Sequence, residues 1–142
     1  MAITYGFFNS VDGDRKYNVE QISEYFDGLI SDGVFQSVGR KFLVTAGAGL
    51  TVNIDTGRAL IECHWIKNDN VLTISLDASD VQNDRKDLIV IKLDYSERTM
   101  GIEYIKGAES VRNTETVKYL TLAKITVPAG ANTITQANIK DY

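Results

Sequence analysis

The chain contains few of the residue types from which cysteine- and histidine-based sites are built. Among its 142 residues there are one cysteine, one histidine, one tryptophan and one proline. A single cysteine excludes an intramolecular disulfide and any zinc site made of several cysteines. A histidine-based metal site could draw on only one histidine. We therefore expect no metal and no cofactor.

Long apolar runs and an excess of positive charge are also missing. No apolar stretch approaches the ~18–20 residues that span a bilayer, and the first residues lack the basic and apolar regions of a signal peptide. The net charge is -4, whereas a general nucleic-acid binder needs a basic surface. We expect no membrane insertion, no nucleic-acid partner and synthesis in a cytoplasm.

Hydrophobic residues make up 44% of the chain, which suits one globular domain. One stretch, "YNVEQISEYFDGLISDGVF", is typical of a helix. Asn18 can cap its first turn, with Gln21 three residues later as in a capping box. Apolar residues follow at helical spacing up to Leu29. We predict a helix over about residues 18–31, with Gly28 inside it and Gly33 beyond its end.

Further along the chain the apolar period becomes two, in segments such as "LTVNIDT", "LIVIKLDY" and "TVKYLTLAKITV". Short strands separated by glycine, asparagine and aspartate turns indicate a sandwich or barrel. The sequence therefore predicts a mainly β protein. An antiparallel β-sandwich or barrel-like domain over 38–142 follows an N-terminal arm, 1–37, with one short α-helix. The longest strand is predicted to align on one face Val117, Tyr119, Thr121, Ala123, Ile125 and Val127.

The stretch "LVTAGAGLTVNIDTGRALIECHW" is rich in glycine but fits no phosphate-binding loop. A Walker loop needs a lysine after its last glycine, and a dinucleotide loop must run into a helix. Here the glycines border alternating β sequence. We interpret "TAGAG" and "DTGR" as turns, in which glycine supplies positive φ angles.

Cys63 and His64 are the only candidates for a nucleophile–base pair. Neighbours on a strand point to opposite faces, so on a strand they cannot form such a pair. We expect Cys63 to be a small buried residue that shares a face with Trp65. We expect Trp65 to anchor the core or an interface, and alternatively to be a platform for a sugar. No catalytic residues are expected, and we predict that the chain is not an enzyme.

Two acidic clusters resemble cation sites only in part. The segment 12–14 begins like a calcium loop, but Lys16 and Ser23 stand where ligands belong. The segment "DASDVQNDRKD", residues 77–87, is predicted to be a solvated loop between strands, because Arg85 and Lys86 compete for its acids. We expect no metal in either; the alternative for residues 77–87 is a calcium site.

The aromatic start of the chain, with Tyr5, Phe7 and Phe8, precedes any core element. Apolar residues at a terminus need cover. We favour a partner or a symmetry mate as that cover; the alternative is an edge strand added to the chain's own sheet.

Several segments resemble tail and baseplate proteins of phages and prophages of Gram-positive bacteria. "YGFFNSVDGDRKYNVEQISEYFDGLISDGVF" is similar to the N-terminal, attachment-type segment of their tail-fibre and receptor-binding proteins. "FLVTAGAGLTVNIDTGRALIECHWIKND", "DRKDLIVIKLDYSERT" and "LTLAKITVPAGANTITQANIKDY" resemble their following stretches in order and spacing. The resemblance covers nearly the whole chain, with Lys86 in place of the apolar residue of a typical "RID".

The resemblance implies a virion structural protein at the tail tip or baseplate, made in the host bacterial cytoplasm. It would serve as an attachment or adaptor module for a fibre or receptor-binding component. The expected partners are other tail or baseplate proteins and further copies of the chain, as a trimer or hexamer. The predicted interface comprises Tyr5, Phe7, Phe8, Tyr17, Ile22, Tyr25, Phe26 and Leu29.

The alternative function is that of a carbohydrate-binding module for host cell-wall polysaccharide, with a surface glycan as partner. Aromatic rings that stack on sugars would carry it. The candidates are Trp65, Tyr95, Tyr104 and Tyr119.

Overall fold

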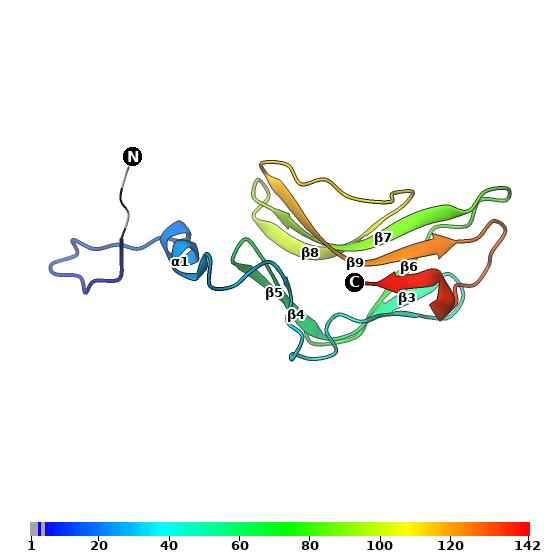
Figure 1. The fold of residues 1–142 in the computed structure, drawn as a ribbon, viewed down its shortest axis with the longest axis horizontal. Coiled ribbons are helices and arrows are strands. Elements are labelled where there is room, and N and C mark those ends of the chain that lie inside the picture. Colours follow the sequence, from blue (N-terminus) through cyan, green and yellow to red (C-terminus); the bar gives the residue numbers. More distant parts are fainter. Residues whose placement is uncertain (1–2, 4) are drawn as a thin grey trace.

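The computed structural model describes residue 3 and residues 5–142. It is mainly β, with three antiparallel sheets and a short helix near the N-terminus (Figure 1), which confirms the predicted fold class. Within the described residues no helix is long and apolar enough to cross a membrane. The elements are α1 (Val19–Phe26), β1 (Gly33–Val34), β2 (Val44–Ala46), β3 (Thr51–Ile54), β4 (Gly57–Ile61), β5 (His64–Asn68), β6 (Leu72–Ser75), β7 (Arg85–Asp94), β8 (Thr99–Ile105), β9 (Val117–Val127), η1 (Gln136–Asn138) and β10 (Ile139–Asp141).

The three sheets enclose one hydrophobic core. The largest sheet has the order β10-β9-β7-β8, and the two smaller ones have the orders β1-β4-β5 and β2-β3-β6. In Figure 1 the strands β7, β8 and β9 lie on one side and β3, β4 and β5 on the other. All three sheets supply side chains to the core, which gives the domain its sandwich-like character. Its buried members are Phe42, Val44, Val52, Ile54, Ala59, Ile61, Leu76, Ile89, Ile91, Leu93, Leu122, Ala123, Ile125, Val127 and Ile134.

Strand β7 is buried on both faces. Ile89 and Ile91 belong to the core, whereas Leu88 and Val90 point to the opposite face and are also fully buried. The connection 106–116 runs along that outer side of the sheet (Figure 1). Hydrogen bonds and an ion pair tie this connection to β7 and β9. This cover explains why the sequence of β7 begins apolar on both sides.

A β-bulge changes the face of β9 in mid-strand. Ile89 pairs with Ala123 and Val90 pairs with Thr121, so Leu122 is the extra residue. From Ala123 to the end of the strand, Ala123, Ile125 and Val127 face the core. Leu122 lies in the core as well. The prediction that one unbroken face includes Tyr119 and Thr121 with Ile125 was therefore wrong, because an inserted residue reverses the alternation.

Helix α1 begins where the sequence predicts and ends earlier. The side chain of Asn18 accepts a hydrogen bond from the Gln21 amide, and the Gln21 side chain accepts one from the Asn18 amide, so the capping box is confirmed. The helix stops at Phe26 rather than near residue 31. Gly28 has a φ of +80° and lies outside the helix, because a left-handed residue cannot continue it.

Cys63 lies in a turn and not on a strand. Glu62 and Cys63 are the two loop residues between β4 and β5, since Ile61 pairs with His64 across the hairpin. Both have positive φ angles, 45° and 63°, as a two-residue type I′ turn requires. The predicted strand position of Cys63 was therefore wrong, and so were its shared face with Trp65 and its full burial, since Cys63 is only partly buried, whereas His64 does begin a strand, β5.

The two glycine turns differ in what they require. Gly49 has a φ of +65°, as expected of a turn residue. Gly57 opens β4 without a positive φ, and a Cβ there would stand 2.6 Å from the backbone nitrogen of Phe42. Gly57 is therefore needed for the close approach of a buried aromatic residue rather than for turn geometry.

Candidate functional site

Helix α1 exposes its apolar side chains to solvent. None of its residues is buried, and 47% of Ile22, 58% of Tyr25 and 41% of Phe26 remain exposed. The residues of α1 and of its C-cap that line the space beside the β domain are mostly polar: Val19, Glu20, Ser23, Glu24 and the cap residue Asp27. An amphipathic helix ordinarily turns its apolar face to its own core. This helix turns its acidic face to the β domain and its apolar face away from it.

The segment before α1 folds back on the helix through aromatic contacts. Phe7 packs against Tyr17 and Tyr25, with ring centroids 5.2 and 5.0 Å apart. The hydroxyl of Tyr17 accepts a 2.6 Å hydrogen bond from the backbone amide of Phe8. Residues 5–18 contribute no strand to the sheets, and Figure 1 shows this segment lying away from them.

The structure therefore gathers most of the predicted interface residues into one exposed aromatic cluster. Tyr5 contacts Phe8 edge to face at 6.1 Å, and Tyr25 contacts Phe26 at 5.3 Å. Leu29, which follows the helix, is 72% exposed. We call the apolar side chains of residues 5–30 the arm surface; they include Tyr5, Phe7, Phe8, Tyr17, Ile22, Tyr25, Phe26, Leu29 and Ile30.

A groove of about 940 Å³ separates the acidic face of α1 from the β domain. Its β-domain wall comes from the tip of the β4–β5 hairpin and from the turn between β7 and β8. Trp65 lines it and is 65% exposed, so this ring is no core anchor. The Arg58 guanidinium lies 5.5 Å from the centre of the Trp65 ring. We call this space the acidic groove, after the carboxylates among its lining residues: Glu20, Glu24, Asp27, Asp32, Glu62 and Asp94.

The charges in the acidic groove alter two neighbouring groups. Burial, and then the hydrogen bond that Tyr95 donates to Glu62 at 2.6 Å, raise the pKa of Tyr95 to about 12. Burial and the charges of Asp27, Asp32 and Glu62 raise the pKa of the Cys63 thiol above its usual value. A protonated thiol is a weak nucleophile. His64 packs its ring edge to face against Tyr95, and its Nδ1 lies 2.8 Å from the Glu62 carbonyl oxygen.

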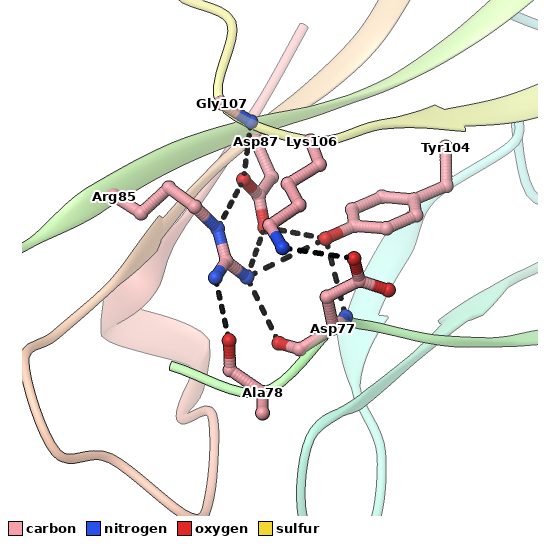
Figure 2. A network of polar contacts seen from close by, with 7 residues as sticks. All are labelled: Asp77, Ala78, Arg85, Asp87, Tyr104, Lys106 and Gly107. Carbon is pink, nitrogen blue, oxygen red and sulfur yellow. Dashed lines mark hydrogen bonds and ion pairs between the residues drawn. The ribbon is translucent and has the colours of Figure 1, made fainter. Parts of the chain in front are cut away.

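A second polar cluster closes one end of the core. Arg85 donates two hydrogen bonds, of 2.8 and 2.9 Å, to the carboxylate of the fully buried Asp87. The guanidinium also donates to the carbonyl oxygens of Ala78 and Asp77. Figure 2 shows how these contacts fasten the connection after β6 to the start of β7.

The Asp87 carboxylate receives two further hydrogen bonds, both 2.8 Å, from the Tyr104 hydroxyl and the Gly107 amide. Burial alone raises the pKa of Asp87, but the hydrogen bonds from Arg85, Gly107 and Tyr104 outweigh it and hold this pKa below its usual value. The pKa of Tyr104 rises to about 12, chiefly through burial. Each nitrogen of the Arg85 guanidinium and each oxygen of the Asp87 carboxylate has a hydrogen-bond partner, which makes this cluster a structural fastening.

The cluster also corrects the interpretation of residues 77–87. Asp87 is not in a solvated loop: it is the third residue of β7 and is fully buried. The competition expected from Arg85 is real, because Arg85 binds Asp87 directly. The signal in the sequence is that Arg85 and Asp87 are two residues apart, because this spacing puts both side chains on one face of a strand. Asp80 caps its own loop by accepting hydrogen bonds from the amides of Gln82 and Asn83.

The four candidate sugar-stacking residues do not form one platform. Trp65 and Tyr95 both line the acidic groove. Tyr104 packs against the core, with its hydroxyl in the Asp87 cluster, and Tyr119 lies on β9, opposite Lys92. Over the described part of the chain, no group of three or more histidine, cysteine, aspartate or glutamate side chains could hold a metal ion.

No family model matches the chain, and comparisons with curated proteins and with solved structures found no match.

Proposed function

We propose that this chain is a non-catalytic virion structural protein of a phage or prophage tail tip or baseplate, an attachment or adaptor module for a fibre or receptor-binding component. The proposed mechanism is docking. The arm surface buries itself against neighbouring subunits or another tail protein, and the β domain carries the next component.

The observation that carries this proposal is the direction of the apolar face of α1. Burying a large apolar side chain contributes about 1.5–3 kcal/mol, and the chain leaves between 41% and 72% of each of Ile22, Tyr25, Phe26 and Leu29 in water. An eight-residue helix is too short to be stable alone in water. Both features favour a partner that covers the arm.

The resemblance to tail proteins is the second support. The Arg85 and Asp87 of its "RID"-like motif are the buried pair at the start of β7. In this interpretation the residues of the motif stabilise the fold, and the residues of the arm bind the partner.

The test is incorporation into particles. In the strain that makes the particle, Ile22→Ser with Leu29→Ser would replace the intact chain, and purified tails would be probed for it. We expect the variant to be lost from the tails. Val71→Ser with Val81→Ser is the matched control, because both valines are exposed on the β domain. Tails that retain the arm variant as fully as the control would contradict the proposal.

A carbohydrate-binding function is the second candidate, and the exposure of Trp65 favours it. A tryptophan with 65% of its surface in water beside Tyr95 offers an apolar ring of the kind that stacks on sugars. Binding of purified host wall polysaccharide that is lost in Trp65→Ala would support this function. Equal binding by Trp65→Ala and the intact chain would reject Trp65 as the platform.

A further inference from the structure

We propose that the acidic groove binds an arginine-containing, extended segment of a partner protein, which bridges α1 and the β4–β5 hairpin. This inference concerns the acidic face of α1. The proposed function depends on the opposite, apolar face, so the two can fail separately.

The charges on both walls of the groove are predominantly negative. Glu20 and Glu24 are four residues apart on one face of α1, and Asp27, the residue that follows the helix, lines the same wall. Asp32 and Glu62 stand on the other wall, and among the described lining residues Arg98 is the one arginine or lysine, beside the imidazole of His64.

Most of this negative charge is not neutralised within the chain. Lys118 pairs with Glu62 at 3.4 Å, and Lys92 pairs with Asp94 at 3.5 Å. In the described structure none of the other four groove carboxylates makes an ion pair within 4 Å. Like charges across a gap repel, and a cation placed between them is attracted by both walls. The groove therefore lacks positive charge that an occupant can supply.

The remaining lining favours arginine over a bare ion or a lysine. Trp65, Tyr95, Leu93 and Met100 give the groove an apolar and aromatic part. A guanidinium stacks on aromatic faces and binds carboxylates through two parallel hydrogen bonds. The chain itself gives the example, because Arg58 lies over the Trp65 ring.

The size and charge of the groove identify the kind of occupant. About 940 Å³ is at the upper end of the ~300–1,000 Å³ of ligand sites, enough for several side chains. The arm of a second copy fits poorly, because residues 12–27 carry five acids against Arg15 and Lys16. A basic segment of a different protein matches both the charge and the aromatic part.

The test uses the full chain and an amidated octapeptide of alternating glycine and arginine, with calorimetry for affinity and tryptophan fluorescence for location. Trp65 is the chain's single tryptophan, so its emission reports on the groove. At about 50 mM salt, where screening is weak, we expect binding that changes this emission. The same peptide with neutral citrulline in place of arginine should not bind.

Two charge-matched variants separate the groove from general attraction. Glu20→Gln with Glu24→Gln and Asp27→Asn removes the charges of this wall and should weaken peptide binding about tenfold, as expected for three exposed ion pairs. Glu109→Gln with Glu115→Gln and Asp69→Asn removes the same charge from exposed positions that do not line the groove. This control should weaken binding less than about threefold.

Three results would overturn the proposal: no binding, binding without a change in Trp65 emission, or equal weakening by both variants. The arm variant Ile22→Ser with Leu29→Ser should bind the peptide as the intact chain does. Loss of tail incorporation with peptide binding retained would therefore separate the two docking functions.

Discussion

At the scale of single residues, the stability of the β domain depends on a buried ion pair. Asp87 is fully buried and Arg85 nearly so, with the side chain of Arg85 13% exposed. Removing one partner of such a pair leaves an uncompensated buried charge. We expect Asp87→Asn to lower the free energy of unfolding by about 3 kcal/mol, measured by urea denaturation. Asp69→Asn, at an exposed turn, should leave the midpoint unchanged. Equal midpoints for the two variants would contradict the fastening role.

The same carboxylate predicts how stability depends on pH. The folded pKa of Asp87 lies below its usual value, so the folded state favours the ionised form. This contribution is fully present above the unfolded pKa of about 3.9 and is lost as pH falls through the folded pKa. Denaturation at a series of pH values from about 5 to 2 should show a shallower loss of stability in Asp87→Asn. Parallel curves for the two proteins would rule out this linkage.

Gly57 is a residue at which a single added methyl group should destabilise the fold. A Cβ would stand 2.6 Å from the Phe42 nitrogen and 2.8 Å from its ring, and the backbone cannot easily move aside. We expect Gly57→Ala to destabilise the domain by about 1–3 kcal/mol, as overpacked sites do, in a thermal or urea transition. Gly101→Ala is the control, because a Cβ there meets nothing within 4 Å. If Gly57→Ala left the stability unchanged, the backbone around Phe42 would have to move to make room for the methyl group, which would contradict this prediction.

At the scale of elements, α1 depends on its cap more than on packing. The helix has eight residues, none of them buried, and helices of this length are marginal in water. Asn18→Ala removes the hydrogen bond to the Gln21 amide and should weaken the helix by about 1 kcal/mol. Hydrogen exchange should then be faster in the α1 amides and unchanged in β7. Unchanged exchange in α1 would mean that something other than the cap holds the helix.

Elements governed by local sequence were predictable, and those governed by distant contacts were not. The capping box of α1 and the alternation of β7 lie within a few consecutive residues, so the sequence contains the full signal. The bulge at Leu122 arises from how β9 pairs with β7 and has no local signature. The Glu62–Cys63 turn escaped prediction because neither residue is a glycine or an asparagine, although both adopt positive φ angles.

The same distinction applies to the candidate site. The aromatic start of the chain was recognisable from composition alone. The path of the connection after α1 determines which face of the helix lies against the β domain, and the sequence of the helix alone does not give that path. The acidic groove likewise combines residues as distant as Glu20 and Arg98, so no local pattern could indicate it.

At the scale of the whole molecule, a packed β domain carries an arm that remains incompletely covered. The core draws on all three sheets and closes with the Arg85–Asp87 pair, whereas the arm surface stays in water. Strand β1, inside the predicted arm of residues 1–37, pairs with β4 and belongs to the β domain, so the part free for association is residues 5–30. The central claim is therefore that the arm surface is an interface between copies of this chain.

Light scattering of the purified chain at micromolar concentration tests this claim most directly. We predict a mass of three or six times the 15.8 kDa protomer, which falls to that of one protomer in Ile22→Ser with Leu29→Ser and not in Val71→Ser with Val81→Ser. A multiple that both variants retain, or a single-protomer mass for the intact chain, would contradict the claim that the arm joins copies of this protein.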